Sequence, residues 1–530
     1  MIRRTRTEMH LVSTGLAVAS VSTLSLALGY GREIVIAHQF GASRVTDAFF
    51  VAYFTPQIIF QLLVTGPLVW ALTPLFAEVR SRESDEAHDR LAGGILTIAV
   101  AIMAPLVAGW MVFATEIAGV IAPSYEGSAK AMTADLSRIM APQLLTYGAG
   151  AVLTAVLYSR GRVLLPVCAQ LVNNLVLLVL IVFLKPTFGI QGIAIAVVVA
   201  SAAFLATLVI GVARTGGSVR PRAPHLGAHG PRLAAGVAPL AALGVLSQVP
   251  GFAERAFASS LPAGELAGIS YGYRLLQLAL TAIGAMTTVA FVGLAAKAAR
   301  QDKEGFRRSL AQNLHMNLKF GILAMGATAV LAPLLVHLAY SGGRISSGDE
   351  DLITATTTMA AAGLPLVGLI GALQQPLFAT SRWRPLAGLT CLYVAVNVIA
   401  SAVLITVAGY RGFVAANVLA LLVAAGAYAG YSWRRYDLRY RPLGRSLGQT
   451  AVATTAASGV VLALNQFVWN DGLNRVDTAF ALSLSFGVYA VVAFGMLIAA
   501  RDEVALAFIE VVRRRFQAAL LPSPRSRVSP

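Results

Sequence analysis

The amino-acid sequence predicts an all-α polytopic membrane protein of about 14 transmembrane helices, with two six-helix lobes in parallel pseudo-repeat and two extra C-terminal helices. Hydrophobic residues make up 57% of the 530 residues, charged residues make up only 12%, and the mean hydropathy is +0.73. This composition is typical of a chain whose main solvent is hydrocarbon. Apolar runs of about 18 residues or more recur along the whole length and leave no room for a sizeable soluble domain.

The apolar runs define the predicted membrane spans in order. They are 11–37, 47–77, 91–113, 136–159, 163–184, 188–213, 234–260, 264–294, 313–340, 352–379, 385–408, 412–433, 447–467 and 477–500. Each is long enough to cross a hydrocarbon core of about 30 Å at a rise of about 1.5 Å per residue. The first span follows Arg3, Arg4 and Arg6, but its apolar run is too long for a signal-peptide core. We therefore expect it to be retained.

The placement of the 41 Lys and Arg residues predicts the orientation of the spans. Most of them lie in the two termini and in every second loop, namely 80–90, 160–162, 214–232, 297–308, 382–384 and 434–445. Loops rich in Lys and Arg face the cytoplasm, so both termini are predicted to be cytoplasmic. This distribution also accounts for the net charge of +17 without any nucleic acid as a partner.

An internal repeat relates the first twelve spans. The turn at 158–162 recurs 222 residues later at 380–384, and each copy is followed by a proline and an intramembrane asparagine. Six spans per copy preserve the orientation, as in parallel repeats related by an axis along the membrane normal. The predicted parts are an N-lobe (1–213), a cytoplasmic linker (214–233), a C-lobe (234–435), spans 13 and 14 (436–500), and a cytoplasmic amphipathic helix with a tail (501–530). The two lobes are expected to face a central cavity.

Three arginines, Arg32, Arg255 and Arg274, lie inside or at the ends of apolar runs. A charge near the bilayer centre costs about 2.5–3.5 kcal/mol even on insertion scales, so it persists mainly where it faces water, a partner or a ligand. Arg274 lies ten residues beyond Gly264 at the outer end of its span, hence roughly 15 Å deep. Because guanidinium matches phosphate oxygens in a bidentate fork, the arginines predict an anionic, phosphate-bearing cargo.

Internal ion pairing is the alternative interpretation of these arginines. Arg32 has Glu33 beside it and Asp47 in the next span, and Arg255 follows Glu254 directly. For Arg274, no acid lies nearby in the sequence. At the start of the ninth span, Gln312, His315 and Lys319 share a helical face, and snorkelling towards lipid phosphates is their expected role, with a gate as the alternative.

Enzymatic motifs are missing from the sequence. It contains no HExxH, Walker, GxSxG or kinase pattern, so covalent catalysis and ATP hydrolysis have no support. Cys168 and Cys391 each lie alone within a span, without metal-ligand spacing. The protein is therefore predicted to be a transporter that draws its energy from a gradient and needs no cofactor.

Four stretches resemble the MurJ/MviN lipid II flippases of the multidrug/oligosaccharidyl-lipid/polysaccharide exporter superfamily. They are 29–78, which begins GYGREIVIAHQFGASRVTDAFF, 122–142 (APSYEGSAKAMTADLSRIMAP), 165–175 (LPVCAQLVNNL) and 254–277 (ERAFASSLPAGELAGISYGYRLLQ). The resemblance spans about residues 10 to 435. It implies two lobes that alternate between inward- and outward-facing states and move an undecaprenyl-pyrophosphate-linked sugar across the bacterial inner membrane, with lipid II for peptidoglycan synthesis as the favoured cargo.

The resemblance also implies roles for individual residues. Arg32, Asp47 and Arg274 match charged positions that the family needs, and the arginines would line the cavity at the pyrophosphate. Arg255 joins this predicted substrate site, and the further candidates for the cavity or a gate are Glu33, Glu254, Arg138 and Gln61. Thr390 and Asn397 lie near the family's sodium position, so they form a candidate cation site, with plain helix–helix hydrogen bonding as the alternative.

Four residues depart from the family pattern. Leu26 stands where an arginine is usual, Phe60 and Gln61 stand at a basic pair, and Thr65 replaces an acid. The chain is thus either a diverged lipid II flippase or a paralogue that moves another lipid-linked glycan, such as an exopolysaccharide or O-antigen unit. A non-transporting scaffold for cell-wall synthesis proteins is a third hypothesis. The membrane potential, at about 2.3 kcal/mol per charge per 100 mV, would assist an outward-moving anionic headgroup without sodium or any other bound ion.

Overall fold

The computed structural model describes residues 2–63, 66–217, 220–223, 227, 229–380, 382–436, 441–468, 474–502 and 506. All regular secondary structure within these ranges is helical, which confirms the predicted all-α fold. Nine helical stretches of the described residues are long and apolar enough to cross a membrane, by length and composition. Thr65, residues 218, 219, 224–226 and 228 of the predicted linker, and nearly all of the C-terminal tail lie outside the described residues.

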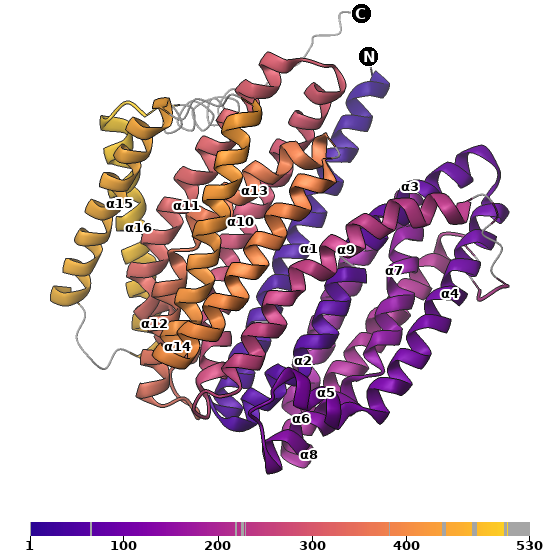
Figure 1. Cartoon of the computed structure of the whole chain (residues 1–530), viewed down its shortest axis with the longest axis horizontal. Helices are drawn as coiled ribbons and strands as arrows, with labels where there is room; N and C mark the ends of the chain where they lie inside the picture. Colours follow the sequence, from indigo (N-terminus) through magenta and orange to yellow (C-terminus); the bar gives the residue numbers. More distant parts are fainter. Residues whose placement is uncertain are drawn as a thin grey trace, which may run out of the picture. The chain divides into compact units, whose positions relative to one another are not determined.

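The described helices follow one another as shown in Figure 1. They are α1 (Ile2–Phe40), α2 (Arg44–Leu63), α3 (Pro67–Arg82), α4 (Asp85–Val112), α5 (Ala114–Ile121), α6 (Gly127–Met140), α7 (Gln143–Ser159), α8 (Leu164–Arg214), α9 (His229–Ala258), α10 (Glu265–Ala299), α11 (Lys303–Tyr340), α12 (Ser347–Ala361), α13 (Leu364–Ala379), α14 (Trp383–Tyr436), α15 (Arg441–Val468) and α16 (Arg475–Ala499).

Prolines interrupt three of the predicted spans. The span 47–77 divides into α2 and α3 before Pro67, and 136–159 divides into α6 and α7 at Pro142. The span 352–379 divides into α12 and α13, and Pro365 lies in the first turn of α13. Proline has no N–H to donate to the preceding turn, so it fits the first turn of a helix, and at these three places a new helix begins beside it.

Two pairs of predicted spans are instead joined into single kinked helices. In α8 the kink is at Gly189, with φ 55° and ψ −131°, and in α14 it is at Gly409, with φ 57° and ψ −135°. A positive φ of this kind favours glycine. The two glycines occupy corresponding places in the predicted repeat, so the shared kink supports the relation between the two copies.

The chain forms two compact units. Unit 1 comprises Met1–Arg274, Ala339–Thr356 and Thr390–Ala420, and unit 2 comprises Leu275–Leu338, Thr357–Leu389 and Leu421–Pro530. Unit 1 takes in segments on both sides of the predicted linker, so these units do not coincide with the predicted lobes, which stay a prediction.

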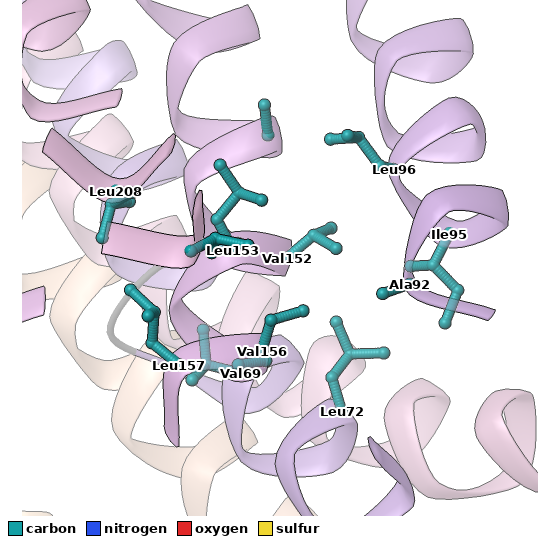
Figure 2. Packing of buried hydrophobic residues seen from close by; sticks show 14 of the residues in the cluster. Val69, Leu72, Ala92, Ile95, Leu96, Val152, Leu153, Val156, Leu157 and Leu208 are labelled. Atoms are coloured by element: carbon teal, nitrogen blue, oxygen red, sulfur yellow. The ribbon is translucent and has the colours of Figure 1, made fainter. Parts of the chain in front are cut away.

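Apolar side chains hold together the helices of unit 1. Figure 2 shows one cluster in which Leu72 of α3, Leu96 of α4 and Val156 of α7 point towards one another. Leu208 of α8 belongs to the same cluster, and its side chain is fully buried. A second cluster packs α1, α2, α6 and α8 together. These contacts fix the helices that carry the predicted site residues Arg32, Glu33 and Asp47.

Buried polar contacts fasten the C-terminal helices of unit 2. Lys319 of α11 forms an ion pair with Asp502, just beyond α16, and the side chains of both are at most 4% exposed. The Ser446 hydroxyl of α15 donates to the same carboxylate at 2.9 Å. The expectation that Lys319 snorkels to lipid phosphates is therefore wrong, because a carboxylate that follows the last span occupies its ammonium group.

Candidate functional site

Arg274 lies in unit 1 and forms no ion pair with the described residues. Its guanidinium carbon lies 5.4 Å from the centroid of the Tyr30 ring, and the Tyr30 hydroxyl donates to the Arg274 carbonyl at 2.9 Å. Its Nε is buried and has no hydrogen-bond partner, and among the described residues no carboxylate lies within ion-pairing distance. A Cβ at Gly29 would lie only 3.2 Å from Arg274 Nη2, so glycine there makes room for the guanidinium.

Arg32 has the opposite electrostatic setting. It forms an ion pair with Glu33, and the two residues are only 8% and 7% exposed. The Arg32 guanidinium also lies 5.7 Å from the centroid of the Tyr53 ring. The interpretation of Arg32 as internally paired with Glu33 is thus confirmed, whereas Asp47 is not its partner. The recess beside Arg32 has room for about one water molecule, so it is too small for a phosphate group.

Arg255 resembles Arg274 rather than Arg32. Its guanidinium carbon lies 3.3 Å from the centroid of the Phe54 ring, and its Nη1 donates to the Gly251 carbonyl at 3.0 Å. The alternative in which Arg255 pairs with Glu254 is wrong for this structure. The Glu254 carboxylate instead accepts hydrogen bonds from Asn397 at 2.9 Å and from Asn417 at 3.1 Å. Arg255 therefore keeps its charge free of a carboxylate partner within the described residues.

Each of the three arginines lies against an aromatic ring of α1 or α2, and we call the arginines with these rings the arginine cluster. Tyr53 and Phe54 are neighbours on α2, and they lie against Arg32 of α1 and Arg255 of α9 respectively. Arg274 of α10 also interacts electrostatically with Glu33, the partner of Arg32. Contacts between helices α1, α2, α9 and α10 thus bring together residues that are more than two hundred positions apart in the sequence.

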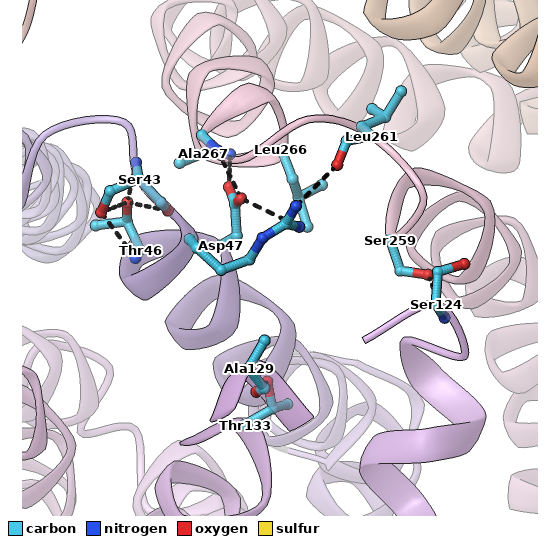
Figure 3. Close-up of polar contacts among 12 residues, drawn as sticks. Ser43, Thr46, Asp47, Ser124, Ala129, Thr133, Ser259, Leu261, Leu266 and Ala267 are labelled. Carbon is cyan, nitrogen blue, oxygen red and sulfur yellow. Dashed lines mark hydrogen bonds and ion pairs between the residues drawn. The ribbon is translucent and has the colours of Figure 1, made fainter. Parts of the chain in front are cut away.

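Asp47 has a different place from the one predicted. It is fully buried, and its carboxylate accepts hydrogen bonds from the backbone N–H groups of Gly264 at 2.7 Å and Ala267 at 2.8 Å (Figure 3). Arg44 lies 3.8 Å from the same carboxylate. Asp47 therefore caps the N-terminus of α10 and does not line the arginine cluster. Its carboxylate positions the helix that carries Arg274.

Two further candidates lie elsewhere. Arg138 pairs with Asp135 at 2.8 Å, and it donates to the Met111 carbonyl at 3.2 Å and to the Thr115 hydroxyl at 3.0 Å. Its side chain thus fastens the corner between α4 and α5 instead of entering the arginine cluster. Gln61 is exposed in the last turn of α2.

The candidate cation site contains an acid that the sequence interpretation assigned to another role. Asn397 hydrogen-bonds Glu254, and its own Oδ1 is buried without a hydrogen-bond partner. Asn417 completes the group around the carboxylate. Thr390 lies two turns before Asn397 on α14. Only adjacency to Arg255 suggested a partner for Glu254, and the sequence carries no signal that joins it to α14.

Connections of unit 1 meet at the end that the charge pattern predicts to be outer. The Ser124 backbone N–H donates to the Ser259 hydroxyl at 3.1 Å, and Arg44 donates to the Leu261 carbonyl at 3.2 Å. Figure 3 shows these contacts beside Asp47. They link the α1–α2 and α5–α6 connections to the α9–α10 connection, so this end of unit 1 is closed by hydrogen bonds.

Comparisons with known proteins agree on one family. The family model described as "Lipid II flippase MurJ" matches residues 36–475. A probable lipid II flippase MurJ of Rhizobium tropici is 26% identical over 517 residues, which cover 92% of this chain and 94% of the relative. The lipid II flippase MurJ of Burkholderia cenocepacia is 26% identical over 379 residues, covering 68% of this chain and 72% of the relative.

Solved structures show the same fold. A lipid II flippase MurJ in an inward closed conformation superposes with a TM-score of 0.76 at 18% identity, covering 91% of this chain and all of that one. An inward-facing multidrug resistance transporter of the MATE family gives a TM-score of 0.69 at 13% identity, covering 80% of this chain and 98% of that one. At these identities the likeness concerns the fold.

Proposed function

The chain belongs to the lipid II flippase MurJ family, and from this premise we propose that it moves lipid II from the cytoplasmic to the periplasmic leaflet by alternating access. It is accordingly a multi-pass membrane transporter and not an enzyme. Lipid II, an undecaprenyl-pyrophosphate-linked precursor of peptidoglycan, is its substrate, and membrane lipids surround it. We place it in the bacterial inner membrane with both termini in the cytoplasm, which the alternation of Lys and Arg supports.

The unpaired charge of Arg274 is the observation that carries this proposal. A guanidinium whose buried Nε has no partner is costly, and an anion with several acceptor oxygens is the ligand that relieves the cost. Arg255 adds a second charge that is stacked but not paired. Arg32 is already neutralised by Glu33. We therefore assign the pyrophosphate to Arg274 and Arg255, with Arg32 and Glu33 as the neutral edge of the cluster.

Phe60 supports a second candidate, another lipid-linked glycan as substrate. Its ring packs 4.7 Å from the ring of Tyr147 and 6.2 Å from that of Phe204, in the apolar cluster of α3, α4, α7 and α8. In lipid II flippases the resemblance expects a basic residue there. A partly buried aromatic ring packed against this cluster has no charge to hold a headgroup phosphate, so this chain has fewer cations available for its cargo.

We propose the membrane potential as the driving force, with sodium as a further coupling ion at Glu254. The carboxylate of Glu254 and the unpartnered Oδ1 of Asn397 are hard oxygen ligands of the kind that sodium binds. Such a cation would be held by Glu254, Asn397 and Asn417. It would compensate the Glu254 charge and fix α9 relative to α14. This residue set suits a cation better than the two neutral residues Thr390 and Asn397 alone.

Complementation tests the proposed function. Cells depleted of their own lipid II flippase would receive the wild-type chain, Arg274→Ala, Arg274→Lys, or Arg82→Ala as a matched control at an exposed arginine. We expect wild type and Arg82→Ala to restore growth and periplasmic lipid II, Arg274→Lys to do so weakly, and Arg274→Ala to fail. Full transport by Arg274→Ala would overturn the assignment. Failure of wild type despite normal membrane expression would favour the other glycan.

A further inference from the structure

Each arginine of the cluster lies against an aromatic ring. Arg274 lies against Tyr30 at 5.4 Å, Arg32 against Tyr53 at 5.7 Å, and Arg255 against Phe54 at 3.3 Å, measured from the guanidinium carbon to the ring centroid. All three rings come from α1 and α2. Only Arg32 has a carboxylate partner as well. The rings are therefore the principal side-chain contacts of the two unpaired guanidinium groups.

A ring holds a guanidinium differently from a carboxylate. The face of the ring carries partial negative charge, which attracts and orients the cation. The ring has no net charge, so it leaves the cation free to bind an anion, whereas a carboxylate would compete with that anion. Phe54 has no hydroxyl, so its hold on Arg255 comes only from the ring. Tyr30 adds a hydrogen bond to the Arg274 carbonyl, which fixes the backbone of α10 at the same level.

Glycines make room for both contacts. A Cβ at Gly251 would lie 2.5 Å from Phe54 Cζ, and a Cβ at Gly29 would lie 3.2 Å from Arg274 Nη2. The Phe252 ring meets the Phe54 ring edge-on at 5.2 Å and supports it from the side. The backbone of α9 and α1 is thus shaped to let ring and guanidinium approach closely.

We propose that Tyr30 and Phe54 are positioning residues that hold Arg274 and Arg255 in place for the substrate pyrophosphate without neutralising them. This inference rests on the proposed function. It adds two uncharged side chains to the substrate site, neither of which contributes a charge or a hydrogen bond to the cargo. Their removal should weaken anion binding through the arginines and leave the fold in place.

The test measures binding of undecaprenyl pyrophosphate to the purified full-length protein in detergent. Tyr30→Leu and Phe54→Leu should each weaken the Kd about tenfold, the effect of losing a largely desolvated cation–π contact. Tyr30→Phe, which keeps the ring and loses the hydroxyl, should bind within about twofold of wild type. Phe60→Leu is the matched control, because it makes the same kind of change on α2 in the apolar core.

A double-mutant cycle and fluorination separate positioning from folding. In an Arg274→Gln background, Tyr30→Leu should have no further effect, because its arginine is gone. Mono-, di- and trifluorophenylalanine at Phe54 keep the shape of the ring and progressively remove the charge on its face, so affinity should fall stepwise. Unchanged affinity across the fluorinated series, or an undiminished loss in the Arg274→Gln background, would overturn the inference alone. Wild-type protein that does not bind the lipid would overturn the proposed function with it.

Discussion

Asp47 caps α10 and so determines the position of Arg274, which lies about three turns further along the same helix. Its carboxylate accepts hydrogen bonds from the backbone N–H groups of Gly264 and Ala267, and α10 begins at Glu265. Arg274 follows ten residues after Gly264, so the register of α10 at this cap sets the height of its guanidinium. The sequence suggests that Asp47 lines the cavity, but Asp47 instead acts on the proposed substrate site by fixing the backbone of α10.

Removing the Asp47 carboxylate should therefore reduce both stability and transport. Asp47→Ala leaves two N–H groups without acceptors in a fully buried place, which should cost about 2–3 kcal/mol. Asp47→Asn keeps one acceptor oxygen and should lose less. Thermal unfolding of the purified variants and lipid II transport in proteoliposomes measure the two effects. Asp135→Ala, at an exposed carboxylate paired with Arg138, is the control and should change little.

The sequence was enough to identify the candidate arginines, but it did not identify most of the side chains that contact them. The pair Arg32–Glu33 was predictable because the residues are adjacent, and Arg274 was singled out because no acid is near it. The stacking of Arg255 on Phe54 had no sequence signal, because the two residues lie on helices that meet only in the fold. Apolar patterns report which side chains avoid water, and they do not report which ring lies under which guanidinium.

At the scale of helices, the ion pair of Lys319 and Asp502 fastens the C-terminal pair α15 and α16 to α11. Lys319→Ala leaves a buried, uncompensated carboxylate and should lower the free energy of unfolding by about 3–5 kcal/mol. The double variant Lys319→Leu with Asp502→Leu removes both charges and should recover most of that loss. Denaturation of the purified proteins measures both effects. Equal stability of the single and double variants would contradict the pairing.

The hydrogen bonds at the predicted outer end of unit 1 should open during transport. Ser124 and Ser259 are joined across two connections, so cysteines in both places should form a disulfide under oxidising conditions. We expect the oxidised S124C/S259C variant to stop flipping lipid II and the reduced variant to resume. Each single cysteine variant serves as a control. Unimpaired transport by fully crosslinked protein would show that this end does not open.

Helix boundaries were harder to predict than helices. Hydropathy marked apolar stretches that are indeed helical, but Pro67 and Pro142 divide two of them because proline acts on the backbone and leaves hydropathy unchanged. Conversely, the expected loops near Gly189 and Gly409 are kinks inside α8 and α14. At both glycines the non-helical segment is so short that the helix continues directly after the kink.

At the scale of the whole molecule, the direction of transport should follow the membrane potential. Moving one elementary charge across 100 mV is worth about 2.3 kcal/mol, so a negative-inside potential should accelerate the outward passage of an anionic headgroup. In proteoliposomes, we expect collapse of the potential to slow lipid II flipping in wild type and in Glu254→Gln alike. Added sodium should stimulate wild type only. Sodium stimulation that persists in Glu254→Gln would remove Glu254 from the coupling site.

The organisation of the whole chain was only partly predictable. The repeat is visible in the turns and in the matching kinks, whereas the compact units combine segments that the sequence assigns to different lobes. Residues 339–356 and 390–420 join unit 1 although segments of unit 2 separate them from its first 274 residues in the sequence. Contacts between distant connections, such as those of Asp47, determine this grouping, and no local pattern encodes them.

The arginines that stack on aromatic rings also affect how the empty transporter returns to its starting conformation. Rings orient Arg255 and Arg274 without cancelling them, so the site is positive when empty, and the two negative charges of a bound pyrophosphate make it neutral. A negative cell interior therefore draws the vacant site inward, whereas it exerts little net force on the filled site. The electrical gradient would thus power the recovery stroke, and cargo loading itself would switch that force off.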